Sequence, residues 1–279
     1  MIKKGKMVVT GAGSGLGRSI SLVFAREGWI VGVSDINLEA AAETVRLIKE
    51  AGGGALACYV DVSDPASIEK MAAYYYEEWG GVDLLVNNAG IANVGMCGGV
   101  TPDDWKQVIE INQLGMIYGC HSFIPRMKEQ GGGHIVNVSS AGGFVCLPQM
   151  APYNTSKAAV VALSETLKSE LAPFNIDITV LCPTFFKTNL IHGMKYTDDF
   201  QLEYTEAAFN NTRITSDMVA ESLLKAVRKR KLYCIPQFTG KSLWFLKRLC
   251  PSGYHKCLAL LYKNGGEKML LWLAKKGLA

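Results

Sequence analysis

Short apolar segments alternate with amphipathic segments along the first 236 residues. Between the apolar segments, hydrophobic residues recur at helical spacing, as in residues 38–52, where a glycine ends the pattern. Such an alternation predicts an α/β fold: a single, doubly wound parallel sheet of the Rossmann type, flanked by helices. The expected strands are residues 7–10, 29–35, 55–62, 82–88, 134–140, 177–183 and 232–236.

The pattern changes after residue 236, where short apolar clusters mix with lysines. Pro251-Ser-Gly and Asn264-Gly-Gly interrupt this part of the chain and predict three short helices. We therefore expect one domain over 1–236 and a basic, apolar helical extension over 237–279. No uncharged run approaches the ~20 residues that a transmembrane helix needs.

The extension carries most of the positive charge. Residues 241–279 hold eight lysines or arginines and one glutamate, a net charge of +7, whereas the whole chain carries +4. Tryptophan and leucine beside basic residues, in SLWFLKRL and MLLWLAKK, are typical of helices in a membrane interface. Two alternatives stay open: packing over the domain's own substrate cleft, and burial in an oligomer interface.

Localisation and excluded partners follow from simple patterns. The N-terminus enters a strand pattern almost at once and has no secretory signal, which predicts a cytoplasmic protein, with membrane association at its surface as the further option. RKRK at 228–231 raises nucleic-acid binding, but lysines interleaved with leucine and tryptophan fit a lipid surface better, so no nucleic-acid partner is expected. The eight cysteines and four histidines show no ligand spacing, so no metal site is expected.

The segment TGAGSGLG follows the first expected strand and opens a helix. Ligands of doubly wound sheets bind at the carboxyl ends of strands, which is where this segment lies. Gly11 permits a tight turn, Gly15 lets the backbone approach a phosphate, and Gly17 allows close packing of helix on strand. Amides at the helix N-terminus then face a pyrophosphate. The segment predicts dinucleotide binding.

Asp35 ends the second expected strand. A carboxylate there accepts hydrogen bonds from both hydroxyls of an adenosine ribose and repels a 2′-phosphate. No basic residue stands at 36–38, and Ser14 occupies the glycine loop, although Arg18 lies one turn further on. NAD(H) is therefore favoured over NADP(H). The alternative is that Asp35 is only a helix N-cap.

The stretch YNTSK places Lys157 one helical turn after Tyr153. A tyrosine titrates near pH ~10 and is a poor base at neutral pH, but a lysine at i+4 favours the phenolate. Because the chain has 11 tyrosines, such a pair also arises by chance, and its context must decide.

In that context, residues 5–236 resemble the short-chain dehydrogenase/reductase family. The motifs that carry the resemblance, in order, are TGAGSGLG, Asp61 after the third strand, NNAG at Asn87 to Gly90, Asn112 in EINQLG, VSS ending at Ser140, and YNTSK. Ser140 lies 13 residues before Tyr153, the separation that this family shows between its catalytic serine and tyrosine.

The resemblance implies a proton-transfer set of four residues. Ser140 would polarise the carbonyl, and Tyr153 would be the general acid/base. Lys157 and an oxidised nicotinamide would lower the pKa of Tyr153, and Lys157 would also bind the adjacent ribose. Asn112 would hold a water that links Lys157 to solvent. Taken singly, Ser140 could instead satisfy a strand end and Asn112 could hydrogen-bond within its helix.

The resemblance also implies the remaining cofactor contacts and the assembly. The helices that carry EINQLG and YNTSK would pair between subunits in a homodimer or homotetramer. One departure is Thr184, which follows Pro183 where the family commonly has glycine, so the local backbone path stays open. The full set of expected cofactor residues is Gly11, Ser14, Gly15, Leu16, Gly17, Asp35, Asp61, Val62, Asn88, Ala89, Gly90, Tyr153, Lys157, Pro183 and Thr188.

Residues 1–236 are thus expected to be an NAD-binding catalytic domain, with a substrate lid at about 189–211. The expected substrate pocket is apolar and has no arginine cluster to clamp an acid. It predicts a lipophilic alcohol, secondary rather than primary and steroid-, retinoid- or long-chain-like, with its ketone or aldehyde. Alternatives are reduction of a 3-oxoacyl thioester and a non-catalytic nucleotide-sensing or membrane-scaffold protein. The candidate pocket residues are Val94, Met96, Phe144, Val145, Leu147, Met150, Phe185, Phe186, Met194, Tyr196 and Phe200.

Overall fold

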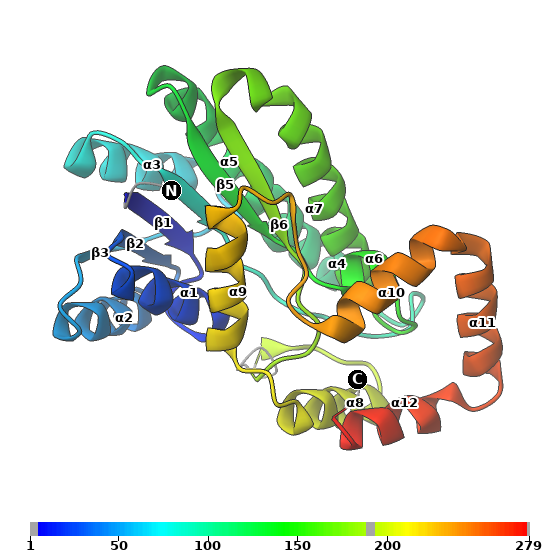
Figure 1. Ribbon diagram of the computed structural model, residues 1–279. Coiled ribbons are helices and arrows are strands. Elements are labelled where there is room, and N and C mark those ends of the chain that lie inside the picture. Colours follow the sequence, from blue (N-terminus) through cyan, green and yellow to red (C-terminus); the bar gives the residue numbers. More distant parts are fainter. Residues whose placement is uncertain (1–4, 188–192, 278–279) are drawn as a thin grey trace.

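The computed structural model describes residues 5–187 and 193–277 and contains a parallel sheet between two layers of helices (Figure 1). The seven strands run in the order β3-β2-β1-β4-β5-β6-β7, and every pair is parallel. This architecture confirms the expected Rossmann-type fold. The strands are β1 Lys6–Thr10, β2 Ile30–Asp35, β3 Ala55–Tyr59, β4 Leu84–Asn87, β5 Gly133–Val138, β6 Ile176–Leu181 and β7 Tyr233–Cys234.

Helices cover both faces of the sheet. Helices α1 (Gly15–Arg26), α2 (Leu38–Glu50) and α9 (Ser216–Arg228) lie on one face. Helices α3 (Pro65–Trp79), α5 (Gly115–Glu129) and α7 (Ala151–Glu170) lie on the other. The remaining helical segments of this domain are α4 Pro102–Ile109, the π-helical turn η1 Glu110–Leu114, α6 Gly142–Val145, η2 Ala172–Phe174 and α8 Asp199–Asn211.

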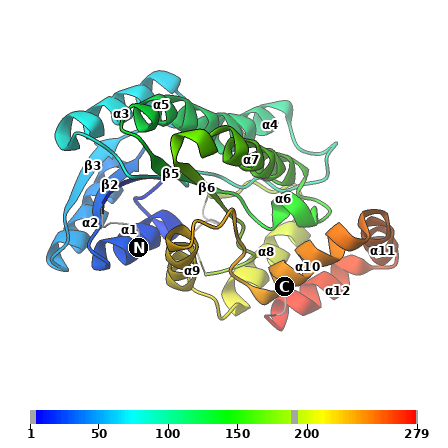
Figure 2. The ribbon, with the colours of Figure 1, turned by 45° about the horizontal axis from the view of Figure 1, so that its top comes forward.

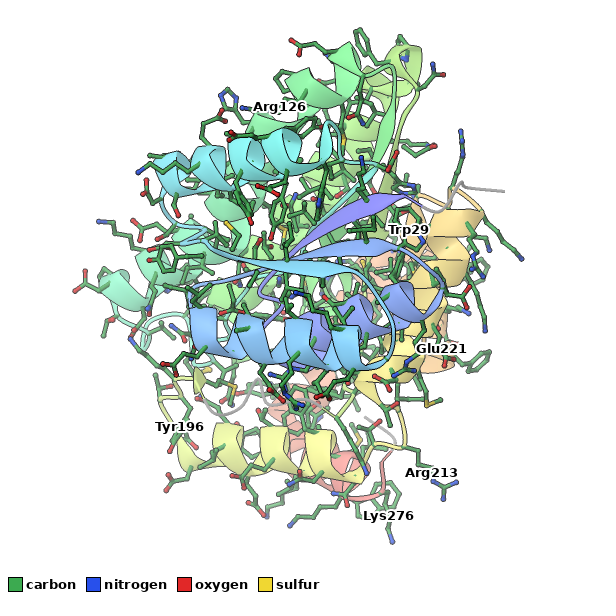
Figure 3. All side chains as sticks on the ribbon, turned by 90° about the vertical axis from the view of Figure 1, so that its left-hand side faces the viewer. Trp29, Arg126, Tyr196, Arg213, Glu221 and Lys276 are labelled. Atoms are coloured by element: carbon green, nitrogen blue, oxygen red, sulfur yellow. The ribbon has the colours of Figure 1, made fainter. Side chains whose placement is uncertain are left out.

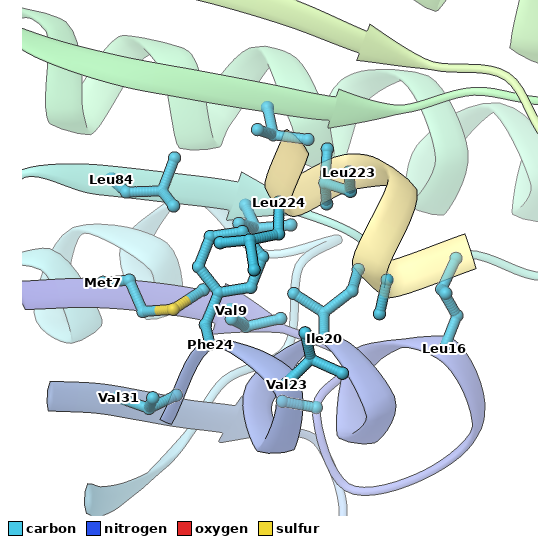
Figure 4. Packing of buried hydrophobic residues seen from close by; sticks show 14 of the residues in the cluster. Met7, Val9, Leu16, Ile20, Val23, Phe24, Val31, Leu84, Leu223 and Leu224 are labelled. Atoms are coloured by element: carbon cyan, nitrogen blue, oxygen red, sulfur yellow. The ribbon is translucent and has the colours of Figure 1, made fainter. Parts of the chain in front are cut away.

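Successive strand residues point to opposite faces, and both faces are buried. On one face, Phe24 of α1 packs with Leu223 and Leu224 of α9 over Met7 and Val9 of β1 (Figure 4). On the other face, β1 contributes Val8 to a second cluster built on α3 and α5. Burial of each such side chain contributes about 1.5–3 kcal/mol. The uninterrupted apolar strands thus follow from burial on both sides.

The strand order reverses between β1 and β4, which are neighbours although β2 and β3 separate them in sequence. Loops that leave the carboxyl ends of these two strands diverge to opposite faces and open a crevice between them. The glycine segment after β1 and the NNAG segment after β4 meet at this crevice. The topology therefore places the candidate cofactor loops side by side.

The C-terminal extension forms three helices, as its breaker residues predict: α10 (Phe238–Leu249), α11 (Pro251–Lys263) and α12 (Gly266–Lys275). Pro251 begins α11, and Gly265 separates α11 from α12 at a φ of +82°. Helix α10 packs beside α6, α12 packs on α8, and α11 joins them in an arch at one side of the domain (Figures 1 and 2). Within the described residues, no helix has the length and apolar character to cross a membrane.

Candidate active site

A cavity of about 1220 Å³ lies at the carboxyl ends of the central strands. It extends from the glycine loop past Tyr153 to the helices of the extension. Thr188 falls outside the described residues, and Asn112 is buried behind the cavity wall. The other expected site residues all line the cavity: Gly11, Ser14, Gly15, Leu16, Gly17, Asp35, Asp61, Val62, Asn88, Ala89, Gly90, Ser140, Tyr153, Lys157 and Pro183.

The glycine loop is closely packed, and its backbone lines the cavity as a cradle for a ligand. Gly11 has a φ of +63°, and a Cβ atom on Gly17 would approach the Gly11 carbonyl oxygen to 2.1 Å. The Asn88 side chain donates to the carbonyls of Thr10 (2.9 Å) and Gly11 (3.1 Å), which ties this loop to the end of β4. Ser14 is the N-cap of α1 but its side chain makes no capping hydrogen bond. The first amides of α1 therefore face the cavity as an anion site, and the residues fit a dinucleotide.

Asp35 presents its carboxylate to the cavity from the end of β2. Its two oxygens accept hydrogen bonds from the backbone amides of Gly13 (2.8 Å) and Asn37 (2.9 Å), which fix its orientation. The N-cap of α2 is Asn37, whose side chain accepts from the Ala40 amide at 3.0 Å. The alternative that Asp35 serves as this N-cap is therefore wrong.

Arg18 does not bring its charge into the cavity. Its guanidinium donates to the Thr44 hydroxyl at 3.0 Å and to the Gly13 carbonyl. Among the described residues that line the cavity, Lys157 is the only lysine or arginine. A phosphate on the ribose beside Asp35 would thus meet that carboxylate, and the described lining offers no cation other than Lys157.

Tyr153 and Lys157 lie one turn apart in the first half of α7. The Lys157 Nζ atom is 5.8 Å from the centre of the Tyr153 ring and donates to the Val138 carbonyl at 3.0 Å. Burial lowers the pKa of Lys157 to about 8. Burial also raises the pKa of Tyr153, and a hydrogen bond with Ser140 opposes that rise. The expected lowering of the tyrosine pKa is therefore not present in the protein alone, because removal from water outweighs the polar contacts.

The two serines after β5 have different roles. Ser139 is buried and its hydroxyl donates to the Lys157 carbonyl at 2.7 Å, so it satisfies a backbone group of α7. The Ser140 hydroxyl accepts from the Gly142 amide at 3.1 Å and donates to the Pro183 carbonyl at 3.5 Å. Ser140 and Tyr153 line the same cavity, where a substrate oxygen would enter.

Asn112 lies in the π-helical turn between α4 and α5 and is fully buried. Its side chain pairs with both backbone groups of Ile91, accepting from the amide at 2.8 Å and donating to the carbonyl at 2.9 Å. It also donates to the Ser156 hydroxyl at 3.1 Å. Asn112 therefore joins the loop after β4 to α7, and its part in a water relay stays a prediction. The π-helical turn is a feature that often marks functional sites.

Gln237 contacts two residues of the cavity wall, a role that the sequence did not indicate. It is buried just before α10, accepts from the Thr184 amide at 3.0 Å and donates to the Phe185 carbonyl at 3.4 Å. Opposite Thr184, a Cβ atom on Gly240 would lie 3.0 Å from the threonine methyl group. The threonine that replaces the family's glycine is thus accommodated by α10. Only long-range packing reveals this pairing.

Seven of the eleven expected pocket residues line the cavity. They are Val94, Val145, Leu147, Met150, Phe185, Phe186 and Met194. Four expected positions are wrong. Met96 and Tyr196 are 54% and 45% exposed, and Figure 3 shows Tyr196 at the outer surface. Phe144 packs in the apolar cluster beneath α6, and Phe200 stacks on Tyr204 beside a small separate cavity.

The extension forms the far wall of the same cavity, so within this chain the observed arrangement is packing over the cleft. The Lys247 ammonium donates to the Phe144 carbonyl at 2.6 Å and the Tyr254 hydroxyl to the Val145 carbonyl at 3.1 Å. Both carbonyls belong to α6, which precedes the catalytic helix. The lining residues from α10–α12 are Phe238, Thr239, Ser242, Leu243, Leu246, Cys250, Gly253, Tyr254, Cys257, Leu258, Leu261, Leu270 and Leu273.

Known proteins resemble this chain over the sheet domain and beyond it. The probable oxidoreductase EphD of Mycobacterium tuberculosis is 36% identical over 232 residues, which are 80% of this chain and 39% of EphD. This chain thus spans about two fifths of the length of that relative. The CLA biosynthesis dehydrogenase/reductase of Lactiplantibacillus plantarum is 32% identical over 267 residues, covering 88% of this chain and 93% of the relative.

A crystal structure of a short-chain dehydrogenase/reductase from Burkholderia phymatum, in complex with NAD, superposes with a TM-score of 0.84. It is 29% identical and covers 88% of this chain and 93% of its own. The family model for short chain dehydrogenases matches residues 6–198, which include the glycine loop, Ser140 and YNTSK. The chain belongs to the short-chain dehydrogenase family.

Proposed function

We propose that this protein is an NAD(H)-dependent dehydrogenase/reductase that interconverts a lipophilic alcohol and its ketone or aldehyde. One observation carries the proposal: Ser140, Tyr153 and Lys157 line the same cavity as a dinucleotide cradle and a largely apolar chamber. A secondary alcohol of steroid, retinoid or long-chain type fits this chamber better than a sugar or small acid, because Lys157 is the only cation in the described lining.

The cofactor would be held by the residues already placed around the crevice. The amides at the N-terminus of α1 would bind the pyrophosphate, and Asp35 would accept from the adenosine ribose. Asp61 and Val62 would contact the adenine, whereas Pro183 and Thr188 would contact the nicotinamide. The NAD in the Burkholderia phymatum relative supports the choice of cofactor. When bound, the nicotinamide accepts or supplies the hydride.

The protein's own residues would move the proton. Ser140 would hold the substrate oxygen, and Tyr153 would take the hydroxyl proton in oxidation and return it in reduction. Lys157, 5.8 Å from the tyrosine ring, would favour the phenolate through its charge. Because burial raises the pKa of Tyr153, a nearby positive charge is needed to make it a base at neutral pH.

The Tyr153→Phe variant tests this function. We expect at least about a 100-fold loss of turnover with NAD⁺ across steroid, retinoid and medium-chain alcohols, because the proton carrier is removed. Cofactor binding, measured by fluorescence of NADH, should stay close to wild type. Tyr196→Phe, on the outer surface, is the matched control.

Three outcomes would contradict the proposal. Unchanged turnover in Tyr153→Phe would remove this residue from the chemistry. Turnover of 3-oxoacyl thioesters alone would replace the lipophilic alcohol by that substrate class. Cofactor binding without turnover on any panel would leave a nucleotide-sensing or scaffold protein.

We further propose a homodimer or homotetramer that pairs through α5 and α7, the helices on one face of the sheet. We place it in the cytoplasm, in contact with a membrane surface through residues 241–279. Light scattering of the purified protein would measure the mass in solution. A monomeric mass at micromolar concentration would contradict the proposed assembly.

A further inference from the structure

Exposed apolar side chains gather on the extension. Half of the large hydrophobic residues exposed in the described part of the chain belong to its three helices. Phe245 and Leu249 of α10 are 59% and 67% exposed and, four residues apart, share one face of the helix. Neither residue lines the cavity. The other exposed members on the extension are Phe238, Leu246, Leu260, Leu261, Met269 and Trp272. A patch of this kind marks an interaction surface.

Residues of the same helices surround an opening, or mouth, of the cavity. Phe238, Leu246 and Leu261 line the cavity and are at the same time 82%, 53% and 42% exposed. Residues that line a cavity and are also exposed to solvent lie at an opening of that cavity. These three residues belong to α10 and α11. The arch of α10 and α11 projects to one side of the sheet domain (Figures 1 and 2). The cavity therefore opens through an apolar rim on the extension.

The extension that carries this rim is also rich in positive charge. Of the eight cations in residues 241–279, Lys275 pairs with Glu203 and Lys247 donates to a backbone carbonyl. Arg248 lies over the Trp244 ring at 4.7 Å. The cations that make no ion pair with a described residue are Lys241, Lys247, Arg248, Lys256, Lys263, Lys268 and Lys276. A negative surface would complement them.

Charge also decides between a membrane and a second copy of the chain. A two-fold contact would place the same +7 segment against itself, where like charges repel, and would close the mouth. An anionic bilayer instead neutralises the lysines and accepts leucine, phenylalanine and tryptophan at the boundary between headgroups and acyl chains. The bilayer is also the phase in which a lipophilic substrate is dissolved.

We propose that α10 and α11 rest on an anionic membrane surface and that the mouth between them takes the lipophilic substrate directly from the bilayer. This inference rests on the proposed function, since it assigns an entrance to the same substrate cavity. Phe245 and Leu249 insert between the lipids, and the lysines contact the headgroups. Phe238, Leu246 and Leu261 give the substrate an apolar path to Tyr153.

The test compares binding of the full chain to vesicles of phosphatidylcholine alone and of phosphatidylcholine with phosphatidylserine. We expect cosedimentation with the anionic vesicles, weakened by added salt because the Debye length shortens. The double variant Phe245→Ser/Leu249→Ser should bind at least about tenfold more weakly, since two inserted side chains are lost. Met218→Ser on α9, a residue that is 46% exposed, should bind like wild type.

A second measurement separates the entrance from the chemistry. With substrate dissolved in buffer the double variant should turn over like wild type, but with substrate loaded into anionic vesicles it should be severalfold slower. Equal rates from vesicles, or equal vesicle binding, would overturn the proposal. The proposal would also be overturned if wild type does not bind vesicles and the double variant forms a smaller oligomer than wild type. Vesicle binding without any turnover would instead contradict the proposed function and leave the surface assignment standing.

Discussion

At the scale of single residues, we expect Asp35 to select the cofactor. Its carboxylate faces the cavity, anchored by the amides of Gly13 and Asn37, with Arg18 turned to other partners. In the Asp35→Ala variant we expect the ratio of kcat/KM with NAD⁺ to that with NADP⁺ to fall at least about tenfold. Removal of the carboxylate abolishes both the ribose acceptor and the repulsion of a 2′-phosphate.

Steady-state kinetics with both cofactors measure this ratio. Asp64→Ala is the control, because Asp64 caps α3 and does not line the cavity. An unchanged ratio in Asp35→Ala would mean that other groups select the cofactor.

The lowered pKa of Lys157 predicts that the rate of carbonyl reduction depends on pH. Burial lowers its pKa to about 8, so the ammonium is charged below that pH and neutral above it. The charge stabilises the phenolate that Tyr153 becomes when it protonates a carbonyl substrate. Carbonyl reduction should therefore slow as the pH rises through about 8. In Lys157→Arg the guanidinium stays charged, so this decline should move to a more alkaline pH. Profiles of kcat/KM that coincide for the two proteins would assign the decline to another group.

At the scale of elements, Gln149 joins four segments of the chain. Its side-chain amide donates to the Tyr262 hydroxyl of α11 (2.7 Å) and to the Glu267 carboxylate of α12 (2.6 Å). Its oxygen accepts from Gln201 of α8 at 2.7 Å. Because Gln149 directly precedes the turn into α7, it connects the extension to the helix that carries Tyr153. It also has a φ of +62°, which only a fixed environment makes favourable for a residue with a side chain.

The Gln149→Ala variant should loosen α12 without unfolding the sheet. A hydrogen bond to a charged group contributes ~1.5–3 kcal/mol, somewhat less where the groups are half-buried, and its loss acts on the local opening of α12. Hydrogen exchange followed by mass spectrometry should show faster exchange in α11 and α12 and unchanged exchange in β1 and β4. Gln130→Ala is the control, since Gln130 makes comparable hydrogen bonds at the opposite end of the sheet. Equal exchange in α12 of both variants would show that the hydrogen bonds of Gln149 do not hold α12 in place.

Elements that are buried on both faces could be predicted from sequence, and irregular segments could not. The strand expected at 134–140 is β5, because a sheet between two helix layers needs continuous apolar runs. The glycine loop could be located because its backbone conformation restricts the residue type. In contrast, Met96 and Tyr196 were placed in the pocket from residue type alone, and loops have no periodicity to tell inward from outward. Gln237 and Gln149 act through partners tens of residues away, which no local pattern reveals.

At the scale of the whole molecule, two units build one chamber. The sheet domain supplies the cradle, Ser140, Tyr153 and Lys157, and the extension supplies a wall of leucines. The extension lines the same chamber as Tyr153, and burial raises the pKa of this tyrosine. Its loss would expose the chamber, so the expected boundary at 236/237 separates segments that share one site.

This shared chamber predicts how activity depends on substrate length. Each methylene that moves from water into the apolar chamber contributes about 0.8 kcal/mol, so kcat/KM should rise roughly fourfold per carbon until the chain reaches the rim. Leu258 of α11 lines the chamber, whereas Leu260 is 60% exposed outside it. Leu258→Trp fills part of the space and should shift the optimum to shorter alcohols, while Leu260→Trp should leave it unchanged. Competition kinetics over a series of secondary alcohols measure both optima. If the chain length with the highest kcat/KM is the same in Leu258→Trp as in wild type, the substrate chain lies along another wall, away from α11.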